Sequence, residues 1–328
     1  MAKIAVTDGM SDKATKLLES SGHSVTRKFI EEDDLLNGAL SEFDAVIVRS
    51  ATKLTKDVIE ASKNGIKVIG RAGVGVDNID IEHAGSLGIP VVNAPRASTQ
   101  SVVELTIGHL LSSIRHIPKA NVGIREYKWE KKSMKGTELY GKNLGLIGFG
   151  RIAQGVASVA RALGMETHAY DPYLPPKIAK EQNTQLHKSV DDLFSMCTHI
   201  TIHCNLTEET HHLVNKKRIE SMPGKSPDGI VCGNHLVNCA RGGIVNENDA
   251  LEALENGNLS SVALDVFEVE PITIDNKLVQ HPNFHGTPHI GAATLEAQDR
   301  VGTDIAKAVM MVLDGKECPT TVNKSYLK

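Results

Sequence analysis

In the first part of the chain, short apolar stretches alternate with longer amphipathic ones. Apolar residues in the longer stretches recur at the helical spacing of three and four. This alternation is typical of repeated βα units, so we expect a parallel sheet covered by helices. The short stretches, which are rich in Val, Ile and Ala, cover residues 3–7, 23–29, 44–49, 67–70 and 90–93.

The pattern changes after Pro95. Residues 98–117 read as one long amphipathic helix, for which Ser98 or Thr99 would be the N-cap. A polar, lysine-rich arm follows at residues 125–135. A last helix, expected at residues 293–313, would pack back on the first lobe, which would then be built from both ends of the chain.

A second βα series begins at Asn143, and we interpret it as an independent doubly wound sheet. The segment 222–233 within it is rich in Pro and Gly and is expected to be a loop. The strands of this series are expected at residues 144–147, 167–170, 199–203, 236–239, 262–266 and 283–285.

Charge and composition exclude several classes of protein. The 328 residues include 36 Lys and Arg against 40 Asp and Glu, and no basic run is longer than Lys131-Lys132, so no nucleic-acid partner is expected. No apolar window reaches the roughly 18 residues of a membrane helix, and the N-terminus lacks the apolar core of a signal peptide. Five cysteines without a CxxC pair favour a reducing cytoplasm.

A glycine-rich turn carries the clearest chemical signal. Gly148 and Gly150 begin a GxGxxA pattern directly after an expected strand and before an expected helix. Gly148 would permit the tight turn, and Gly150 would let a pyrophosphate approach the amides near Arg151 and Ile152. The alternative is a plain strand-to-helix turn.

An acidic residue supports the interpretation of this turn as a dinucleotide site. Asp171 ends the next expected strand, about 20 residues beyond the turn. A carboxylate there accepts hydrogen bonds from a ribose diol and repels a 2′-phosphate, so the predicted cofactor is NAD rather than NADP. Alternatively, Asp171 is only a helix cap before Pro172.

A second glycine turn, at residues 73–77, has no acid at the matching distance. Its amides, including those of Val74 and Gly75, would suit a smaller anion such as a substrate carboxylate. A plain βα turn remains the alternative.

Three strand ends in the second series carry a cation, a carboxylate and an imidazole. Arg241, Glu270 and His289 each follow an expected strand, and such ends meet at one edge of a parallel sheet. We hypothesise that His289 is the base for a substrate hydroxyl, that Glu270 holds its imidazole, and that Arg241 binds the substrate carboxylate. Taken singly, each has an ordinary structural explanation.

A metal site is not expected. His211 and His212 lie near Glu208 and Glu209, but adjacent histidines face different directions and no third ligand is suitably spaced.

The stretches GLIGFGRIAQG, VNCARGGIV, ALDVFEVEP and TPHIGAAT give the chain a family resemblance over nearly its whole length. The chain resembles the D-isomer-specific 2-hydroxyacid dehydrogenases. The resemblance implies that Arg241, Glu270 and His289 are catalytic. It also implies that Asp171 binds the adenosine ribose and that Asp265 contacts the nicotinamide carboxamide, and Cys239 is expected at the cofactor as well.

The expected fold is α/β, with two doubly wound parallel-sheet lobes. Residues 98–292 would form a Rossmann NAD-binding domain. Residues 1–97 plus 293–328 would form a discontinuous, flavodoxin-like substrate-binding domain.

Within the family, the first lobe is similar to the D-3-phosphoglycerate dehydrogenases through VRSATKLT, GRAGVGVDNID and KWEKKSMKGTEL. This similarity implies that Arg49 and Arg71 attract a substrate phosphate, that Val74 and Gly75 hold its carboxylate, and that Lys131 reaches across a homodimer. Arg49 and Arg71 are alternatively ordinary charges at the rim of a cleft.

The implied reaction is the NAD-dependent oxidation of D-3-phosphoglycerate, the entry step of L-serine synthesis, by a short form without a regulatory domain. Two alternatives remain open. One is a glyoxylate or hydroxypyruvate reductase on the same scaffold, and the other is a non-catalytic, NAD-sensing corepressor-like protein.

Overall fold

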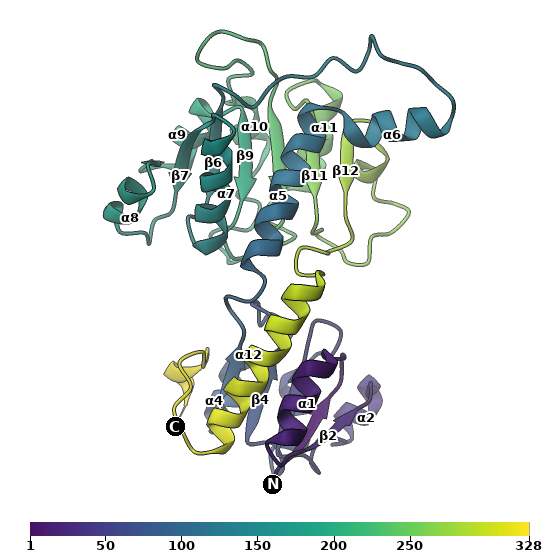
Figure 1. Ribbon diagram of the computed structural model, residues 1–328, viewed down its shortest axis with the longest axis vertical. Coiled ribbons are helices and arrows are strands. Elements are labelled where there is room, and N and C mark those ends of the chain that lie inside the picture. Colours follow the sequence, from purple (N-terminus) through teal and green to yellow (C-terminus); the bar gives the residue numbers. More distant parts are fainter. Residues whose placement is uncertain (328) are drawn as a thin grey trace. The chain divides into compact units, whose positions relative to one another are not determined.

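The computed structural model describes residues 1–327 and divides into two compact units (Figure 1). One unit combines Met1–Ser98 with the segment that begins at Ala292, and the other is Thr99–Gly291. Each unit contains one parallel sheet, so the predicted two-lobed α/β architecture is confirmed. Among residues 1–327, no helix combines the length and the apolar composition that crossing a membrane requires.

In the described part of the first unit, a five-stranded sheet has the order β2-β1-β3-β4-β5. This is the flavodoxin-like order. The strands are β1 (Lys3–Val6), β2 (Ser24–Arg27), β3 (Ala45–Val48), β4 (Val68–Arg71) and β5 (Val91–Asn93). The helices are α1 (Asp12–Ser20), α2 (Glu32–Leu36), α3 (Lys56–Ser62), α4 (Ile81–Ser86) and α12 (Leu295–Leu313).

The C-terminal helix α12 is part of this first unit and covers its sheet. A Cβ atom at Gly70 on β4 would lie 2.8 Å from a methyl group of Val309 on α12. A Cβ atom at Gly302 on α12 would lie 2.8 Å from Ala14 on α1. Glycine at these two positions lets α12 pack closely on both the sheet and α1. Strand β3 is buried at all four positions, as expected for a parallel sheet covered on both faces.

The second unit, Thr99–Gly291, contains a seven-stranded sheet in the order β12-β11-β10-β9-β6-β7-β8. Counted from the first strand of this unit, the order is that of the Rossmann fold with one added strand. The strands are β6 (Asn143–Ile147), β7 (Glu166–Tyr170), β8 (Gln185–Leu186), β9 (His199–Ile202), β10 (His235–Asn238), β11 (Ser261–Leu264) and β12 (Phe284–Gly286). The short strand β8 was not predicted.

Helices cover both faces of this second sheet, and alternate residues of each strand enter two separate cores. Val237 and Ala263 pack under α5 and α7, whereas their neighbours Leu236 and Val262 pack under α9, α10 and α11. The helices are α5 (Thr99–Ile114), α6 (Ile117–Arg125), α7 (Arg151–Ala162), α8 (Pro176–Glu181), α9 (Val190–Met196), α10 (Lys216–Glu220) and α11 (Glu247–Glu255).

The prediction of one helix over residues 98–117 is wrong. Helix α5 ends at Ile114, His116 adopts a left-handed φ of 53°, and α6 then begins. Pro118 explains the break, because it has no N–H for the Ile114 carbonyl and its ring would clash with that carbonyl in a continuous helix. The carbonyl instead accepts a hydrogen bond from the backbone of Thr137 at 3.2 Å.

Candidate active site

The carboxyl ends of the strands in the second unit meet at one edge of its sheet, because all paired strands are parallel. The predicted site residues follow these strands. Gly148 follows β6 and Asp171 follows β7. Arg241, Asp265 and His289 come after β10, β11 and β12, respectively. This edge is where doubly wound sheets bind their ligands.

The two glycines of the first turn have different structural requirements. Gly148 has a φ of 81°, and a Cβ atom there would lie 2.9 Å from the backbone nitrogen of Cys204. Gly150 is the N-cap of α7, and a Cβ atom there would meet no protein atom within 4 Å. Gly148 therefore closes the turn against the backbone that follows β9, while Gly150 leaves open space at the start of a helix. This arrangement fits the pyrophosphate of a dinucleotide.

The other predicted residues of the turn lie on α7. Arg151 is exposed, Ile152 is partly buried, and Ala153 is fully buried against β6. The small Ala153 side chain allows this close approach. Contacts of Arg151 and Ile152 with a cofactor stay predictions.

Asp171 fastens the end of β7 to the glycine turn. Its Oδ2 atom accepts a hydrogen bond from the backbone of Phe149 at 2.9 Å, and its Oδ1 atom accepts one from Tyr173 at 3.0 Å. The carboxylate is thus held beside the turn, as recognition of a ribose next to a pyrophosphate requires.

His289 and Glu270 form a hydrogen-bonded pair. Their Nδ1 and Oε2 atoms are 2.8 Å apart, and the other carboxylate oxygen accepts the backbone N–H of Phe267 at 2.9 Å. About half of the His289 side chain is exposed, so its ring remains accessible to a ligand. The structure therefore supplies an oriented imidazole backed by a carboxylate.

Asp265 lies beneath this pair and is 1% exposed. Its carboxylate accepts hydrogen bonds from the Thr287 hydroxyl at 2.6 Å and from the amides of Ile290 and Gly291 at 2.8 and 2.9 Å. Its backbone carbonyl accepts the His289 N–H at 2.8 Å. Asp265 thus holds the loop that carries His289, and its expected contact with nicotinamide stays a prediction.

The loop that carries Arg241 packs closely against the backbone of the segment that carries Glu270. A Cβ atom at Gly242 would lie 1.7 Å from the carbonyl oxygen of Phe267, so only glycine fits there. The loop after β10 therefore rests directly on the turn that carries Glu270. Asn238 donates a hydrogen bond to the Arg241 carbonyl at 2.8 Å and fixes this loop further.

Cys239 directly follows β10 and is buried next to Thr106 of α5. Burial raises the pKa of its thiol to about 12, so it is neutral at physiological pH. Its assignment to the cofactor site stays a prediction.

In the first unit, the loop after β3 is held by two residues that the sequence analysis did not identify. Asp8 accepts hydrogen bonds from the backbones of Arg49 and Thr52 at 2.7 and 3.0 Å. Asn78 donates to the carbonyls of the same two residues, each at 2.7 Å. Two sequence features could have drawn attention to these residues. Asp8 comes shortly after β1, and Asn78 lies in the segment GVGVDNID.

The second predicted cation of this unit, Arg71, ends β4 and folds over the glycine turn that follows. A Cβ atom at Gly73 would overlap its guanidinium, 1.5 Å from a terminal nitrogen. Val74 is 38% exposed, and its carbonyl accepts a hydrogen bond from Asn93 at 2.7 Å. The sheet order places the ends of β3 and β4 side by side, so the loops of Arg49 and Arg71 are neighbours.

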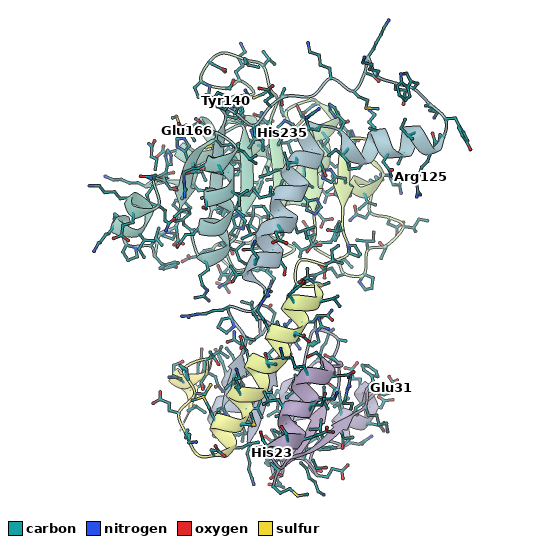
Figure 2. The ribbon with its side chains drawn as sticks, in the orientation of Figure 1. His23, Glu31, Arg125, Tyr140, Glu166 and His235 are labelled. Carbon is teal, nitrogen blue, oxygen red and sulfur yellow. The ribbon has the colours of Figure 1, made fainter. Side chains whose placement is uncertain are left out.

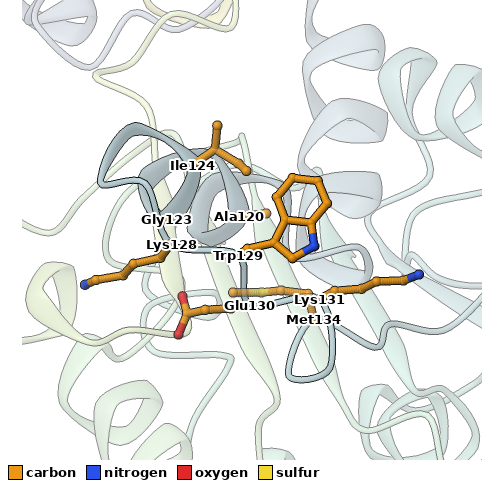
Figure 3. Close-up of a pocket in the computed structure, with 8 residues that line it drawn as sticks. All are labelled: Ala120, Gly123, Ile124, Lys128, Trp129, Glu130, Lys131 and Met134. Carbon is orange, nitrogen blue, oxygen red and sulfur yellow. The ribbon is translucent and has the colours of Figure 1, made fainter.

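Lys131 belongs to the arm after α6 and is exposed. It lines a groove of about 180 Å³ between α6 and the arm, together with Trp129 and Met134 (Figure 3). Its predicted role across a homodimer stays a prediction.

Comparison with known proteins identifies relatives over almost the whole chain. The chain is 44% identical to the D-3-phosphoglycerate dehydrogenase of Methanocaldococcus jannaschii, over 98% of this chain and 60% of that protein. It is also 44% identical to the hydroxypyruvate reductase of Thermotoga maritima, over 95% of this chain and 98% of that protein. The chain thus spans about 60% of the length of the curated D-3-phosphoglycerate dehydrogenases from M. jannaschii and Bacillus subtilis.

The fold has close counterparts among solved structures. A glyoxylate reductase from Paecilomyes thermophila has a TM-score of 0.87 at 26% identity and matches over 98% of both chains. Residues 107–291 match the NAD binding domain of the D-isomer specific 2-hydroxyacid dehydrogenases. The chain belongs to the D-isomer specific 2-hydroxyacid dehydrogenase family.

Proposed function

We propose that this protein oxidises D-3-phosphoglycerate to 3-phosphohydroxypyruvate with NAD, the entry step of L-serine synthesis. The observation that carries the dehydrogenase chemistry is the pair of His289 and Glu270, 2.8 Å apart at the carboxyl edge of a dinucleotide-binding sheet. Several curated relatives are D-3-phosphoglycerate dehydrogenases at 38–44% identity, which supports the choice of substrate.

The side chains at this edge match the steps of alcohol oxidation. Glu270 occupies Nδ1 of His289, so Nε2 is left to take the hydroxyl proton of the substrate as general base. The carboxylate then stabilises the imidazolium that forms. Arg241 binds the substrate carboxylate and polarises the oxygen on C2. Bound NAD supplies the acceptor for the hydride.

The first unit supplies groups suited to the phosphate and carboxylate of the substrate. Arg49 and Arg71 lie at the ends of adjacent strands, and guanidinium groups bind phosphate oxygens in pairs. The turn that contains Val74 and Gly75 offers backbone amides for the carboxylate. Asp8 and Asn78 keep the loop of Arg49 in place.

A hydroxypyruvate or glyoxylate reductase is the second candidate. One observation favours it: the chain is 44% identical to the T. maritima hydroxypyruvate reductase, the same identity as to the D-3-phosphoglycerate dehydrogenase of M. jannaschii. The two candidates share the catalytic residues and differ in the need for a phosphate site.

NADH absorbance in a substrate panel tests the proposal. We expect NAD reduction with 3-phosphoglycerate, and NADH oxidation faster with 3-phosphohydroxypyruvate than with hydroxypyruvate, glyoxylate or pyruvate. Turnover of the unphosphorylated acids alone would transfer the assignment to the reductase. No turnover of any member of the panel would reject the dehydrogenase.

A homodimer completes the proposal. Helix α6 and the arm expose Ile117, Val122, Ile124 and Trp129, each at least half exposed, and large exposed apolar side chains are common at subunit interfaces. Lys131 would then act in the partner subunit. Light scattering of wild-type protein and of Trp129→Glu tests this, with a dimer expected for the former and a monomer for the latter. The cytoplasmic location stays a prediction.

A further inference from the structure

A buried histidine on α5 contacts the loop that carries His289 from behind. His109 is 4% exposed, and its Nε2 atom lies 3.1 Å from the hydroxyl of Thr287. Its ring also contacts the ring of His285, with centroids 5.2 Å apart. Neither the glycine turn nor the pair of His289 and Glu270 uses this side chain, so its role requires a separate explanation.

The direction of the hydrogen bonds is determined by the acceptors. The carboxylate of Asp265 accepts the Thr287 hydroxyl proton at 2.6 Å, and it also accepts the amides of Ile290 and Gly291. A hydroxyl has one proton, so Thr287 is the acceptor towards His109. His109 must therefore carry its proton on Nε2 and donate it, which continues the chain His109 to Thr287 to Asp265.

This chain of hydrogen bonds ends at the backbone of His289. The His289 N–H is accepted by the carbonyls of Asp265 at 2.8 Å and of Thr287 at 3.0 Å. His289 itself has a left-handed φ of 54°, a conformation that costs energy for a residue with a side chain. Both of its backbone partners are therefore residues that belong to the chain from His109.

We propose that His109 is a positioning residue, which holds Thr287 and Asp265 so that the loop 287–291 presents His289 to Glu270. This inference rests on the proposed function, because it assigns His109 to the machinery around the same base. His109 contacts neither reacting atoms nor Glu270, so it acts only through Thr287 and Asp265.

The environment of His109 keeps it a neutral donor. Burial lowers its pKa to about 4, and burial together with the neighbouring His109 lowers the pKa of His285 to about 4 as well. A neutral imidazole donates one hydrogen bond from Nε2 without placing a positive charge beside Asp265.

A matched control is available on the opposite edge of the same sheet. His235 is also 4% exposed, its Nδ1 atom lies 2.7 Å from a hydroxyl, that of Ser261, and burial lowers its pKa to about 4. It begins β10, at the amino edge, as Glu166 begins β7, and both residues are labelled in Figure 2. Its replacement removes this buried hydrogen bond and a second one, from Nε2 to the Cys232 carbonyl at 3.0 Å, at a position six residues before Arg241.

The experiment compares His109→Leu, His109→Gln and His235→Leu. Loss of the donor should lower kcat of His109→Leu with 3-phosphoglycerate about tenfold, the value of one buried hydrogen bond, with a smaller change in KM. Glutamine places an amide N–H near Nε2 and should recover most of kcat. His235→Leu should lower the melting temperature while kcat stays within about twofold of wild type.

Hydrogen exchange of the protein without cofactor or substrate gives a readout independent of activity. The amides of Ile290 and Gly291 should exchange faster in His109→Leu than in wild type or His235→Leu. Unchanged exchange together with unchanged kcat in His109→Leu would overturn the inference, whatever the melting temperature does. If the wild type turns over no 2-hydroxy acid, the proposed function fails, and exchange still decides whether His109 holds the loop.

Discussion

The Nδ1 atom of His289 lies 2.8 Å from the Oε2 atom of Glu270, although the two residues are 19 positions apart in the sequence. The contact requires that the ends of β11 and β12 lie side by side, and these strands are paired in the sheet. It also requires that Glu270 be turned towards the loop, which its hydrogen bond from the Phe267 amide achieves. This geometry leads to the first two predictions.

Replacing His289 with asparagine should remove the base while keeping a polar side chain of similar size. We expect kcat to fall about 10²- to 10⁴-fold, the usual contribution of a general base, with little change in NADH binding. Stopped-flow turnover and NADH fluorescence titration measure the two quantities. His281→Asn is the control, because the His281 ring accepts the Asn283 amide at 3.2 Å, three residues before β12. Turnover of His289→Asn equal to that of the control would contradict the assignment.

Replacing Glu270 with glutamine keeps the shape and the Phe267 hydrogen bond but removes the charge. We expect kcat to fall about 10- to 100-fold, because the imidazolium loses its charge partner. Glu268→Gln, in the same segment, is a matched control whose carboxylate contacts His212 and the Glu247 amide instead. The double variant His289→Asn with Glu270→Gln should be no slower than His289→Asn alone. Additive losses would show that the two residues act separately.

Substitutions of the two glycines in the first turn should separate an effect on stability from an effect on cofactor binding. Gly150→Ala adds a methyl group to open space, so the melting temperature should remain near that of wild type while the Kd for NADH rises at least about tenfold. Gly148→Ala forces a side chain against the backbone of Cys204 at a positive φ and should lower the melting temperature. Calorimetry and fluorescence titration measure both. If Gly150→Ala binds NADH with the affinity of the wild type, the pyrophosphate does not bind at this turn.

Most of the fold could be predicted from local sequence patterns. Many strands of the two sheets, such as β3 (AVIV) and β10 (HLVN), have neighbouring Val, Ile or Leu residues that can be recognised, and the βα rhythm indicates that the sheets are parallel. The two-residue strand β8 carries no such signal, since Gln185–Leu186 joins the sheet only by pairing with β7. The predicted helix ended at residue 117, directly before Pro118, whereas α5 ends at Ile114. The apolar periodicity continues to residue 117 and gave no sign of this earlier break.

Sequence reasoning could identify a site residue only where its chemical type and its position after a strand were sufficient to suggest a role. His289 and Glu270 qualified, because strand ends converge in a parallel sheet. Asp8 also follows a strand, but its role, like the roles of Asn78 and His109, depends on partners far away in the chain. His109, for example, lies 178 positions from Thr287, and nothing near it in sequence indicates that contact.

Arg71 gives a test of substrate choice. If its guanidinium binds the phosphate, Arg71→Met should raise the KM for 3-phosphoglycerate at least about tenfold and change the KM for hydroxypyruvate by less than about threefold. Lys53→Met, an exposed cation of the same unit, is the control and should change neither constant. Initial rates with both substrates measure the ratio. If Arg71→Met raises the KM for both substrates equally, Arg71 does not bind the substrate phosphate.

Buried histidines make the unit Thr99–Gly291 sensitive to acid. Burial lowers the pKa of His109, His168, His235 and His285 to about 4, and that of His203 to about 3. In the unfolded chain each would titrate near 6.5. Below that pH the unfolded state therefore binds more protons than the folded state, and the free energy of unfolding falls as the pH falls.

The loss should begin near pH 6.5 and continue towards the folded-state pKa values, at up to about 1.4 kcal/mol per pH unit for each histidine. Denaturant unfolding between about pH 7.5 and 5 measures it, followed by the fluorescence of Trp129 or by circular dichroism. His168→Gln keeps a polar contact with His187, whose ring nitrogen lies 3.0 Å from His168 Nδ1, but removes one titrating group. Its stability should therefore fall less steeply with acid than that of wild type. A wild-type stability that is constant over this range would contradict the neutral, buried state of these histidines.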